Sequence, residues 1–372
     1  MAKIDDNIAA VLKIDGVANA VVRVRTPWQL NYIARRFDVV AKFPFINSLG
    51  IRCDKREVTR LAAMSEVESV TAQGRVSALD EPHPASDALR ESEASSNAQI
   101  PGEGEELAQI LSRSLTGKGV TLCVLDTGVQ PHIDISVPRD RIKFFSDFVG
   151  GGEHPYDDNG HGTFVTGVAA GGGLLSAGKV RGVAPDADIV ALKVISASGE
   201  TGAFKILEGM QWLYDHFRDY GIKVACMSFG ADPLDTADPL KLGAEMLTRS
   251  GITVVCAAGN SGVGGLKSPG VSSEVITVGA VDEAFRVAPF SSSGVYQGVY
   301  RPDVYAPGVA VRGVEAGGTY AVMSGTSVSA PYVAGACCLL HERYSRLTPR
   351  EAKRMILSSS KVVDGVRVFS MK

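Results

Sequence analysis

The sequence lacks both a strong charge imbalance and a long apolar run. Its 372 residues carry a formal net charge of −3, with 45% hydrophobic and 21% charged residues. Without an excess of basic residues it has no electrostatic footprint for nucleic acid. No apolar run approaches the roughly 20 residues that cross a bilayer. We therefore expect a globular protein that binds neither nucleic acid nor membrane.

Metal-binding cysteine pairs and a secretory leader are also missing. Most of the cysteines lie in apolar runs, and none has the spacing of a metal-ligand pair, so they are interpreted as buried free thiols. The opening residues, MAKIDDNIAAVLKIDG, lack a basic segment followed by an apolar one. Reduced thiols and the missing leader predict a cytoplasmic protein. The cysteines are Cys53, Cys123, Cys226, Cys256, Cys337 and Cys338.

A break in composition divides the chain. Residues 80–105 are rich in proline, serine, glycine and acid, and poor in large apolar residues. Such a stretch buries too little surface to offset its ordering entropy, so it is predicted to be a linker. We expect a small domain at residues 1–79, an acidic linker with a candidate processing site at 80–105, and a large domain at 106–372.

Both domains alternate strand and helix patterns. In the small one, NAVVRVR, SLGIRCD and VESVTAQGRV indicate strands and KREVTRLAAMS a helix, which predicts an α+β fold. The large domain has continuous apolar strands such as TLCVLD, DIVALKVI and GITVVCAAGN between helical segments. This is typical of an α/β parallel sheet covered on both faces, whose ligands bind at the carboxyl ends of the strands.

Four polar residues stand at strand ends or helix starts of the large domain. Asp126 and Asn260 follow apolar strands, and His161 lies between two glycines. Ser327 follows Gly-Thr where another helical segment begins. Each alone fits an ordinary turn or helix-capping residue. Their joint occurrence, in this order and each in its own glycine-bounded context, is far more specific.

These segments resemble the motifs of the subtilisin family of serine proteases. The acid motif is VLDTGV, the histidine motif NGHGTFVTGVAAG, the oxyanion motif AAGN and the serine motif SGTSVSAPYVAG, in the family's chain order. The resemblance spans residues 119–358. It implies a three-layer parallel-sheet domain that hydrolyses peptide bonds through an acyl-enzyme, with polypeptides as substrates.

The resemblance assigns a role to each of the four residues. A serine hydroxyl needs an adjacent base at neutral pH, so His161 would accept the proton of Ser327. Asp126 would hold the imidazole in one tautomer, and Asn260 would donate to the oxyanion.

Ser327 is preferred to two neighbouring serines because it stands where the helix begins and N–H groups are free. Ser324 and Ser329 are expected to bond nearby backbone groups instead. Pro331 is expected in the first helical turn, where proline is tolerated.

Three segments are similar to substrate-binding parts of the family. MSFG would pair with an extended substrate peptide, and SASGETG would line the opposite side of that peptide. AAGN would form the bottom of the pocket for the side chain before the cleaved bond. No acid or base evidently enters that pocket, so we expect a preference for large apolar or aromatic side chains. The residues expected to contact substrate are Ser228, Phe229, Gly230, Ser198, Gly199 and Gly259.

The small domain resembles the family's propeptide, which folds against the cleft and blocks it. Its last strand ends in VSAL, and the bond between Leu79 and Asp80 is the candidate processing site, with the linker as a wider target. We therefore expect a precursor that cuts itself. The alternative is a protease-shaped regulatory protein kept shut by an uncleaved N-terminal domain. A nucleotide-binding sheet is disfavoured because DTGVQPH is not a phosphate-binding glycine loop.

No cofactor is expected to be required, and calcium binding is disfavoured. Asp134 matches one acid of a common subtilase calcium site, but the partner loop GGGLLSAGKVRG lacks the Asn-type oxygen ligands of that site and carries Lys179 and Arg181. Asp157 and Asp158 are expected to be solvated rather than metal-bound.

Overall fold

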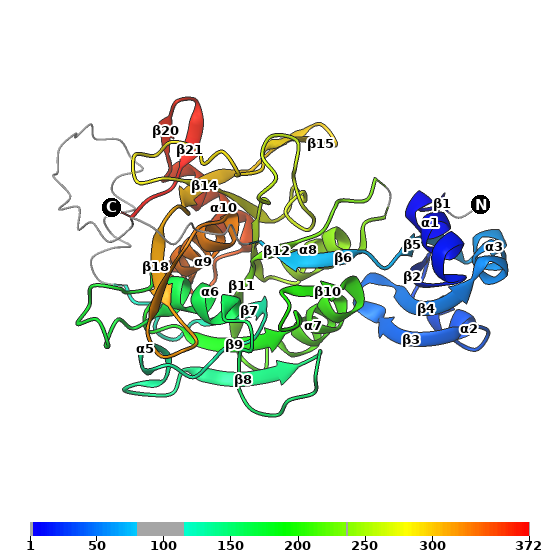
Figure 1. The fold of residues 1–372 in the computed structure, drawn as a ribbon, viewed down its shortest axis with the longest axis horizontal. Helices are drawn as coiled ribbons and strands as arrows, with labels where there is room; N and C mark the ends of the chain where they lie inside the picture. Colours follow the sequence, from blue (N-terminus) through cyan, green and yellow to red (C-terminus); the bar gives the residue numbers. More distant parts are fainter. Residues whose placement is uncertain (1–2, 80–114, 236, 372) are drawn as a thin grey trace.

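The fold comes from a computed structural model, which describes residues 3–79, 115–235 and 237–371. We call residues 3–79 the N-terminal unit and the other described residues the large unit. Figure 1 shows the two units side by side, with strand β6 reaching from the first into the second. The predicted linker lies almost wholly outside the described residues. In the part of the chain that is described, no helix is long and apolar enough to cross a membrane.

The large unit is built on a mostly parallel sheet. Among the described residues its strand order is β20-β21-β17-β14-β13-β11-β7-β9-β8, and only β20 runs antiparallel to its neighbour. Its strands are β7 (Thr121–Asp126), β8 (Ile142–Asp147), β9 (Asp188–Lys193), β11 (Ile222–Met227), β13 (Thr253–Ala257), β14 (Ile276–Val281), β17 (Val304–Pro307), β20 (Lys361–Val363) and β21 (Val366–Val368). Short strands outside it are β10 (Glu200–Gly202), β12 (Phe229–Gly230), β15 (Gly294–Tyr296), β16 (Val299–Arg301), β18 (Val311–Val314) and β19 (Tyr320–Met323).

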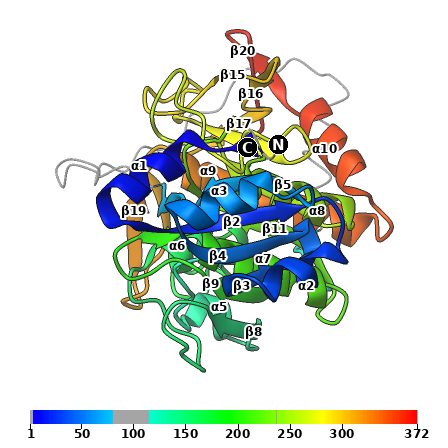
Figure 2. The same cartoon turned by 90° about the vertical axis from the view of Figure 1, so that its right-hand side faces the viewer.

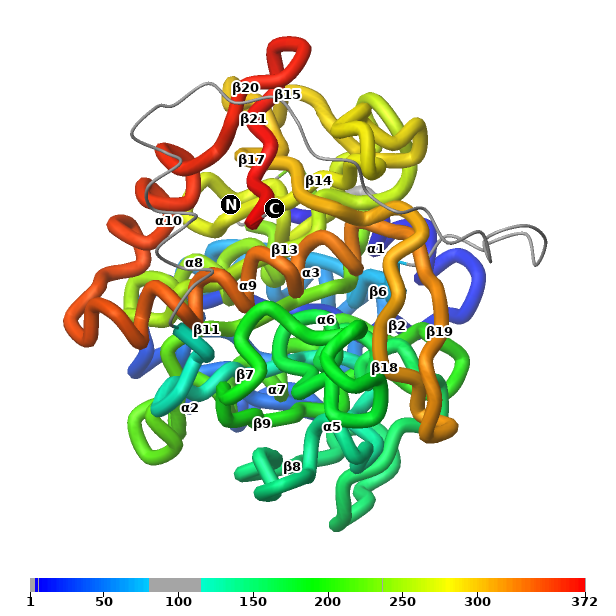
Figure 3. Tube along the Cα trace, turned by 90° about the vertical axis from the view of Figure 1, so that its left-hand side faces the viewer, coloured from blue at the N-terminus to red at the C-terminus, as the bar shows by residue number. Residues whose placement is uncertain are grey.

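Helices cover both faces of this sheet, as the apolar strands predict. Alternate residues of β7 point to opposite sides, so Leu122 and Val124 join one core cluster and Cys123 and Leu125 the other. Figure 3 shows α6 and α9 in front of the strands, whereas α7 and α8 lie on the side of the N-terminal unit. The helices are α5 (Ile133–Ser136), α6 (His161–Ala170), α7 (Ala203–His216), α8 (Pro239–Arg249), α9 (Thr326–Arg343) and α10 (Pro349–Ser358). The prediction of a three-layer α/β fold is confirmed.

The N-terminal unit is an α+β sheet of order β1-β5-β2-β4-β3. One face packs on its own helices in a core that includes Ile8, Val22 and Leu61. The predicted strand VESVTAQGRV is in fact two strands separated at Gln73 and Gly74. The elements are β1 (Lys3–Ile4), α1 (Asp6–Asp15), β2 (Val17–Val24), α2 (Gln29–Ala34), β3 (Asp38–Phe43), η1 (Pro44–Ile46), β4 (Ser48–Asp54), α3 (Lys55–Ala63), β5 (Val67–Ala72) and β6 (Arg75–Ala78).

The other face of this sheet packs against α7 and α8 (Figure 2). The ring of Phe204 lies 5.7 Å from that of Phe43 between centroids. A β-carbon on Gly50 would lie 2.8 Å from the same Phe204 ring, so glycine allows the ring to lie flush on β4. The Gly74 carbonyl accepts a hydrogen bond from the Ala203 N–H (3.0 Å) and thereby caps the start of α7.

Phe204→Ala is expected to destabilise the full chain by about 3 kcal/mol, because a buried phenylalanine replaced by alanine leaves a cavity at the interface. Urea unfolding of the full chain measures this, with Tyr344→Ala at the exposed end of α9 as the control of similar size. Equal unfolding free energies for the two variants would contradict the packing described.

Candidate active site

The first two predicted site residues form a buried pair. Asp126 ends β7, His161 begins α6, and both side chains are 1% exposed. His161 Nδ1 lies 2.6 Å from Asp126 Oδ1, which also accepts from the Thr127 N–H at 2.7 Å. Burial raises the pKa of the Asp126 carboxyl, and the contacts with His161 oppose that rise. The pairing fixes the ring orientation of His161.

The glycines around His161 allow this close approach. Gly160, with φ of 99°, is the N-cap of α6 and has a conformation that favours glycine. A β-carbon on Gly162 would collide with the Gly128 carbonyl oxygen and would lie 3.1 Å from the β-carbon of Asp126. The helix can therefore start directly against the end of β7 only because residue 162 has no side chain.

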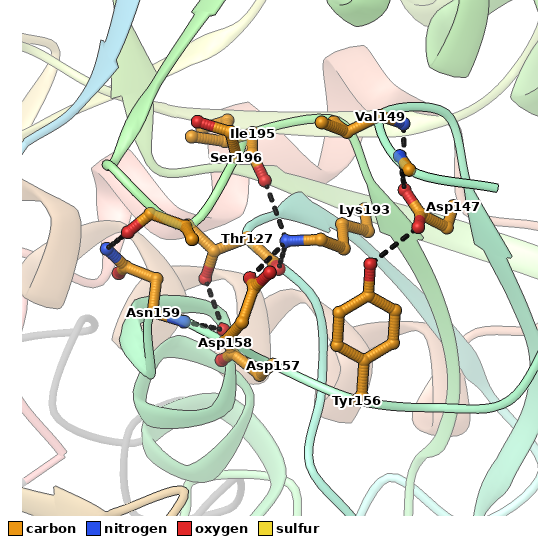
Figure 4. A network of polar contacts seen from close by, with 12 residues as sticks. Thr127, Asp147, Val149, Tyr156, Asp157, Asp158, Asn159, Lys193, Ile195 and Ser196 are labelled. Carbon is orange, nitrogen blue, oxygen red and sulfur yellow. Dashed lines mark hydrogen bonds and ion pairs between the residues drawn. The ribbon is translucent and has the colours of Figure 1, made fainter. Parts of the chain in front are cut away.

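Asp157 holds the start of α6, and the sequence analysis missed this. It is buried, and its carboxylate accepts hydrogen bonds from Thr127, Asn159, Gly160 and Thr163 at 2.7–3.2 Å. Figure 4 shows the contacts with Thr127 and Asn159. Burial alone would raise the pKa of Asp157, but these hydrogen bonds outweigh it and lower the pKa. The expectation that this acid is solvated is wrong, because five donors replace its water.

Lys193 links three loops beneath the site. Its side chain is 1% exposed, and its Nζ donates to the carbonyls of Thr127 and Ile195 at 2.6 and 3.0 Å. It also forms an ion pair with Asp158 at 2.6 Å (Figure 4). The buried ammonium group thereby ties the residue after Asp126 to the segment before β10.

Ser327 lies at the start of α9, as predicted. Helices α6 and α9 pack against each other through Phe164 and Val328, which places the two helix starts on the same side of the sheet. Pro331 is not in the first turn, however, because the helix begins at Thr326. Lacking an N–H, Pro331 cannot donate to the Ser327 carbonyl, which accepts instead from the Ser228 hydroxyl at 2.9 Å.

The neighbouring serines bond backbone groups, as expected, but not only local ones. The hydroxyl of Ser324 accepts from the Ala310 N–H at 2.8 Å, and that of Ser329 donates to the Ala306 carbonyl at 3.1 Å. Both partners are backbone groups, although they are distant in sequence.

Asn260, Ser327 and the carbonyl group of Leu79 meet around Gly325. Asn260 Nδ2 donates to that oxygen at 2.7 Å. Asn260 Oδ1 accepts from the N–H and the hydroxyl of Thr326 at 3.0 and 2.8 Å, which fixes the orientation of the amide. A β-carbon on Gly325 would lie 2.6 Å from the Leu79 oxygen, 2.8 Å from Ser327 Oγ and 3.1 Å from Asn260 Nδ2. The three polar atoms therefore surround a single point.

Strand β6 lies between β10 and β12 as the middle strand of a three-stranded sheet. It is antiparallel to both, with Ala78 opposite Phe229 and Ser77 opposite Gly230 and Glu200. The Ala78 N–H donates to the Gly199 carbonyl at 2.9 Å. The two walls inferred from MSFG and SASGETG thus do hold an extended segment.

The other predicted contact residues differ in their placement. The Ser228 carbonyl accepts from the Leu79 N–H at 3.4 Å, and the Phe229 side chain is fully buried in a core cluster that also contains Val76. Ser198 Oγ bonds Ser196 Oγ at 2.8 Å. Gly259 has φ of 117° and its N–H donates to the Thr326 hydroxyl. Asp80 lies outside the described residues.

Comparison with known proteins agrees with this geometry. The model of the Subtilase family matches residues 117–369. The chain belongs to the subtilase family. Those residues form a subtilisin-like serine protease domain.

Individual relatives match about two thirds of the chain. Serine protease AprX of Bacillus subtilis (strain 168) is 39% identical over 276 residues, which are 66% of this chain and 62% of AprX. Subtilisin Savinase of Lederbergia lenta is 38% identical over 62% of this chain and 80% of its own. The chain thus spans less than two thirds of AprX. A crystal structure of a cold adapted subtilisin-like serine proteinase superposes with a TM-score of 0.58 at 28% identity, covering 68% of this chain and 89% of the other.

Asp134, the acid that the resemblance assigned to a calcium site, accepts hydrogen bonds from two other segments of the large unit. Asp134 is fully buried, and its two carboxylate oxygens accept from the Leu175 N–H at 2.8 Å and the Tyr320 hydroxyl at 2.6 Å. Within residues 3–79, 115–235 and 237–371, no group of three or more His, Cys, Asp or Glu side chains could hold a metal ion. All six cysteines are buried and free, as predicted.

Asp157→Asn is expected to destabilise the large unit by about 1–3 kcal/mol at pH 7, because an amide presents N–H groups to donors that need an acceptor. The stabilisation by Asp157 is fully present above the unfolded-state pKa of about 3.9 and is lost as pH falls through the lower folded-state pKa. Urea unfolding of wild type and variant from pH 7 to pH 3 measures both effects. The difference in unfolding free energy between wild type and Asp157→Asn should become smaller as the pH falls. A difference that grows in acid would contradict the lowered pKa of Asp157.

Proposed function

We propose that this protein is a serine endopeptidase, made as a precursor whose N-terminal unit occupies the substrate cleft. One observation carries the proposal: the Leu79 carbonyl oxygen accepts a hydrogen bond from Asn260 Nδ2, and this oxygen and Ser327 Oγ border the same point beside Gly325, while β6 pairs on both sides. A scissile peptide group would need the same position. The family membership of residues 117–369 supports the reaction class.

The chemistry assigned to the triad begins with proton transfer. His161 takes the Ser327 proton on Nε2 as Ser327 Oγ attacks the carbonyl carbon. The Asp126 carboxylate, 2.6 Å from Nδ1, holds the ring in place and favours the imidazolium. The tetrahedral intermediate collapses, its C–N bond breaks, and the departing amine takes the proton from His161. Water then attacks the ester by the same route, which restores Ser327 and needs no cofactor.

Asn260 stabilises the charge that develops on the carbonyl oxygen. Its Nδ2 already points at such an oxygen, because Thr326 holds the opposite end of the amide. A donor positioned before the reaction needs no reorganisation in the transition state, and this makes it effective. The backbone N–H of Ser327, at the start of α9, is assigned as the second donor.

The N-terminal unit acts as the intramolecular inhibitor in this proposal. Its β6 fills the two edges that a substrate would pair with, and its sheet covers α7 and α8. The bond after Leu79 is the proposed processing site, because Leu79 provides the carbonyl at Asn260. Other polypeptides would enter the same way after this strand leaves, as an added strand between β10 and β12.

Ser327→Ala is expected to abolish both fluorophosphonate labelling of the full chain and any self-made cut near Leu79, because the nucleophile is removed. Mass spectrometry of purified wild type and variant locates the cut, and Ser329→Ala, two residues along the same helix, serves as the control. A cut that persists in Ser327→Ala comes from another protease. Wild type that is neither labelled nor cut would favour the permanently shut regulatory protein.

Asn260→Ala is expected to lower kcat by about 10²–10³-fold, the range known for the oxyanion amide of subtilisin itself. KM should change little, since the donor acts mainly on the charged transition state. Steady-state hydrolysis of a peptide amide separates the two constants. A variant with normal kcat and a raised KM would assign Asn260 to ground-state binding instead.

A further inference from the structure

We propose that Lys267 forms one wall of the pocket that receives the side chain before the cleaved bond, and selects that side chain by size and charge. We call this space the primary pocket; in the structure the Leu79 side chain fills it. The inference rests on the proposed function, since the pocket has a role only if Leu79 marks the position of a substrate residue. Sequence analysis predicted no charged residue there.

The surroundings of Gly230 show that the side chains of Lys267 and Leu79 lie next to each other. A β-carbon on Gly230 would lie 3.2 Å from Leu79 Cδ1 and also 2.5 Å from Cβ and 3.0 Å from Cγ of Lys267. The leucine side chain and the lysine stem therefore flank the same small volume beside β12. Leu79 is buried, at 7% exposure, so this space is closed around a leucine-sized group.

The lysine stem is held on its other side as well. A β-carbon on Gly259 would lie 2.8 Å from Lys267 Cγ, so the stem runs between two glycines that have no side chain to displace it. Backbone bonds fix it in place: the Lys267 N–H donates to the Ala258 carbonyl at 2.9 Å, and the next residue pairs with Ala231. The methylene groups give the pocket an apolar lining even though the residue is charged.

The ammonium end adds a charge close to the pocket. Lys267 Nζ is 2.6 Å from Asp232 Oδ1, and the two side chains are 21% and 88% exposed. Water screens the charge of the exposed Asp232 more than that of the mostly covered lysine. Because Asp232 is the more screened partner, a ligand long enough to reach the ammonium gains when it is an anion.

Two preferences follow for the substrate. The stem leaves room for leucine rather than for an aromatic ring, so leucine should be cleaved in preference to phenylalanine. Glutamate should be cleaved faster than glutamine, which has the same shape without the charge. The substrate class is thus an extended peptide with a leucine-sized aliphatic residue or a glutamate before the cleaved bond.

The test compares kcat/KM for Val-Ser-Ala-X amides, the sequence of residues 76–78, with X as Leu, Phe, Glu or Gln. The full chain is used after its rate on the leucine amide becomes constant, with active sites counted by fluorophosphonate. Lys267→Met keeps the stem and removes the charge, and should lower the Glu:Gln ratio about threefold to fivefold. Asp232→Asn frees the ammonium and should raise that ratio by a similar factor. Lys267→Gly removes the wall and should raise the Phe:Leu ratio about tenfold.

Lys143→Met is the matched control, because Lys143 also pairs with an acid, Asp188 at 3.8 Å, at the opposite end of the sheet. Its ratios should equal those of wild type. Turnover with Glu:Gln ratios that Lys267→Met and Asp232→Asn leave unchanged would overturn the inference and leave the proposed function standing. Wild type without turnover and without labelling would overturn the proposed function and, with it, this inference. Lys267→Met and Asp232→Asn test the effect of the lysine charge even if Lys267→Gly does not fold.

Discussion

The orientation of one amide side chain governs the site. Asn260 can present either its NH₂ or its oxygen to a bound carbonyl, and only the first arrangement is attractive. The N–H and the hydroxyl of Thr326 both donate to Asn260 Oδ1, and this fixes the amide with Nδ2 facing the cleft. Thr326 also begins α9 directly before Ser327, and its hydroxyl accepts from the Gly259 N–H. One threonine thus couples the loop after β13, which carries the amide, to the helix that carries the hydroxyl.

The loops under the site depend on buried charge in a similar way. Asp157 accepts hydrogen bonds from N–H groups at the start of α6, and Lys193 donates to backbone carbonyls just after β7 and β9. Irregular backbone buried beneath a site has few partners of its own, and an unsatisfied polar group there would be costly. A carboxylate accepts many bonds and an ammonium donates three, so two side chains satisfy both sets of groups.

Much of this arrangement is predictable from local sequence. Apolar strands between helices indicate the layered sheet, and the glycine-bounded Asp126, His161, Asn260 and Ser327 stand out at strand ends and helix starts. Contacts between distant segments are not predictable in that way. Nothing near Lys267 indicates that its stem lies beside Leu79, and Asp157 has the sequence context of a solvated loop acid. The prediction that Pro331 lies in the first helical turn is wrong for the same reason. Pro331 leaves the Ser327 carbonyl without a helical donor, and the Ser228 hydroxyl that bonds this carbonyl comes from a segment distant in sequence.

The antiparallel pairing of β6 on both sides has a consequence for which proteins could be digested. A chain segment as long as residues 75–79 must be fully extended, with both backbone edges available, before it fits between β10 and β12. Segments inside a native sheet or helix have those edges already occupied by their own hydrogen bonds. Under the proposed function, the susceptibility of a target protein would therefore follow its local unfolding, and damaged, nascent or naturally unstructured chains would be degraded before well-folded ones.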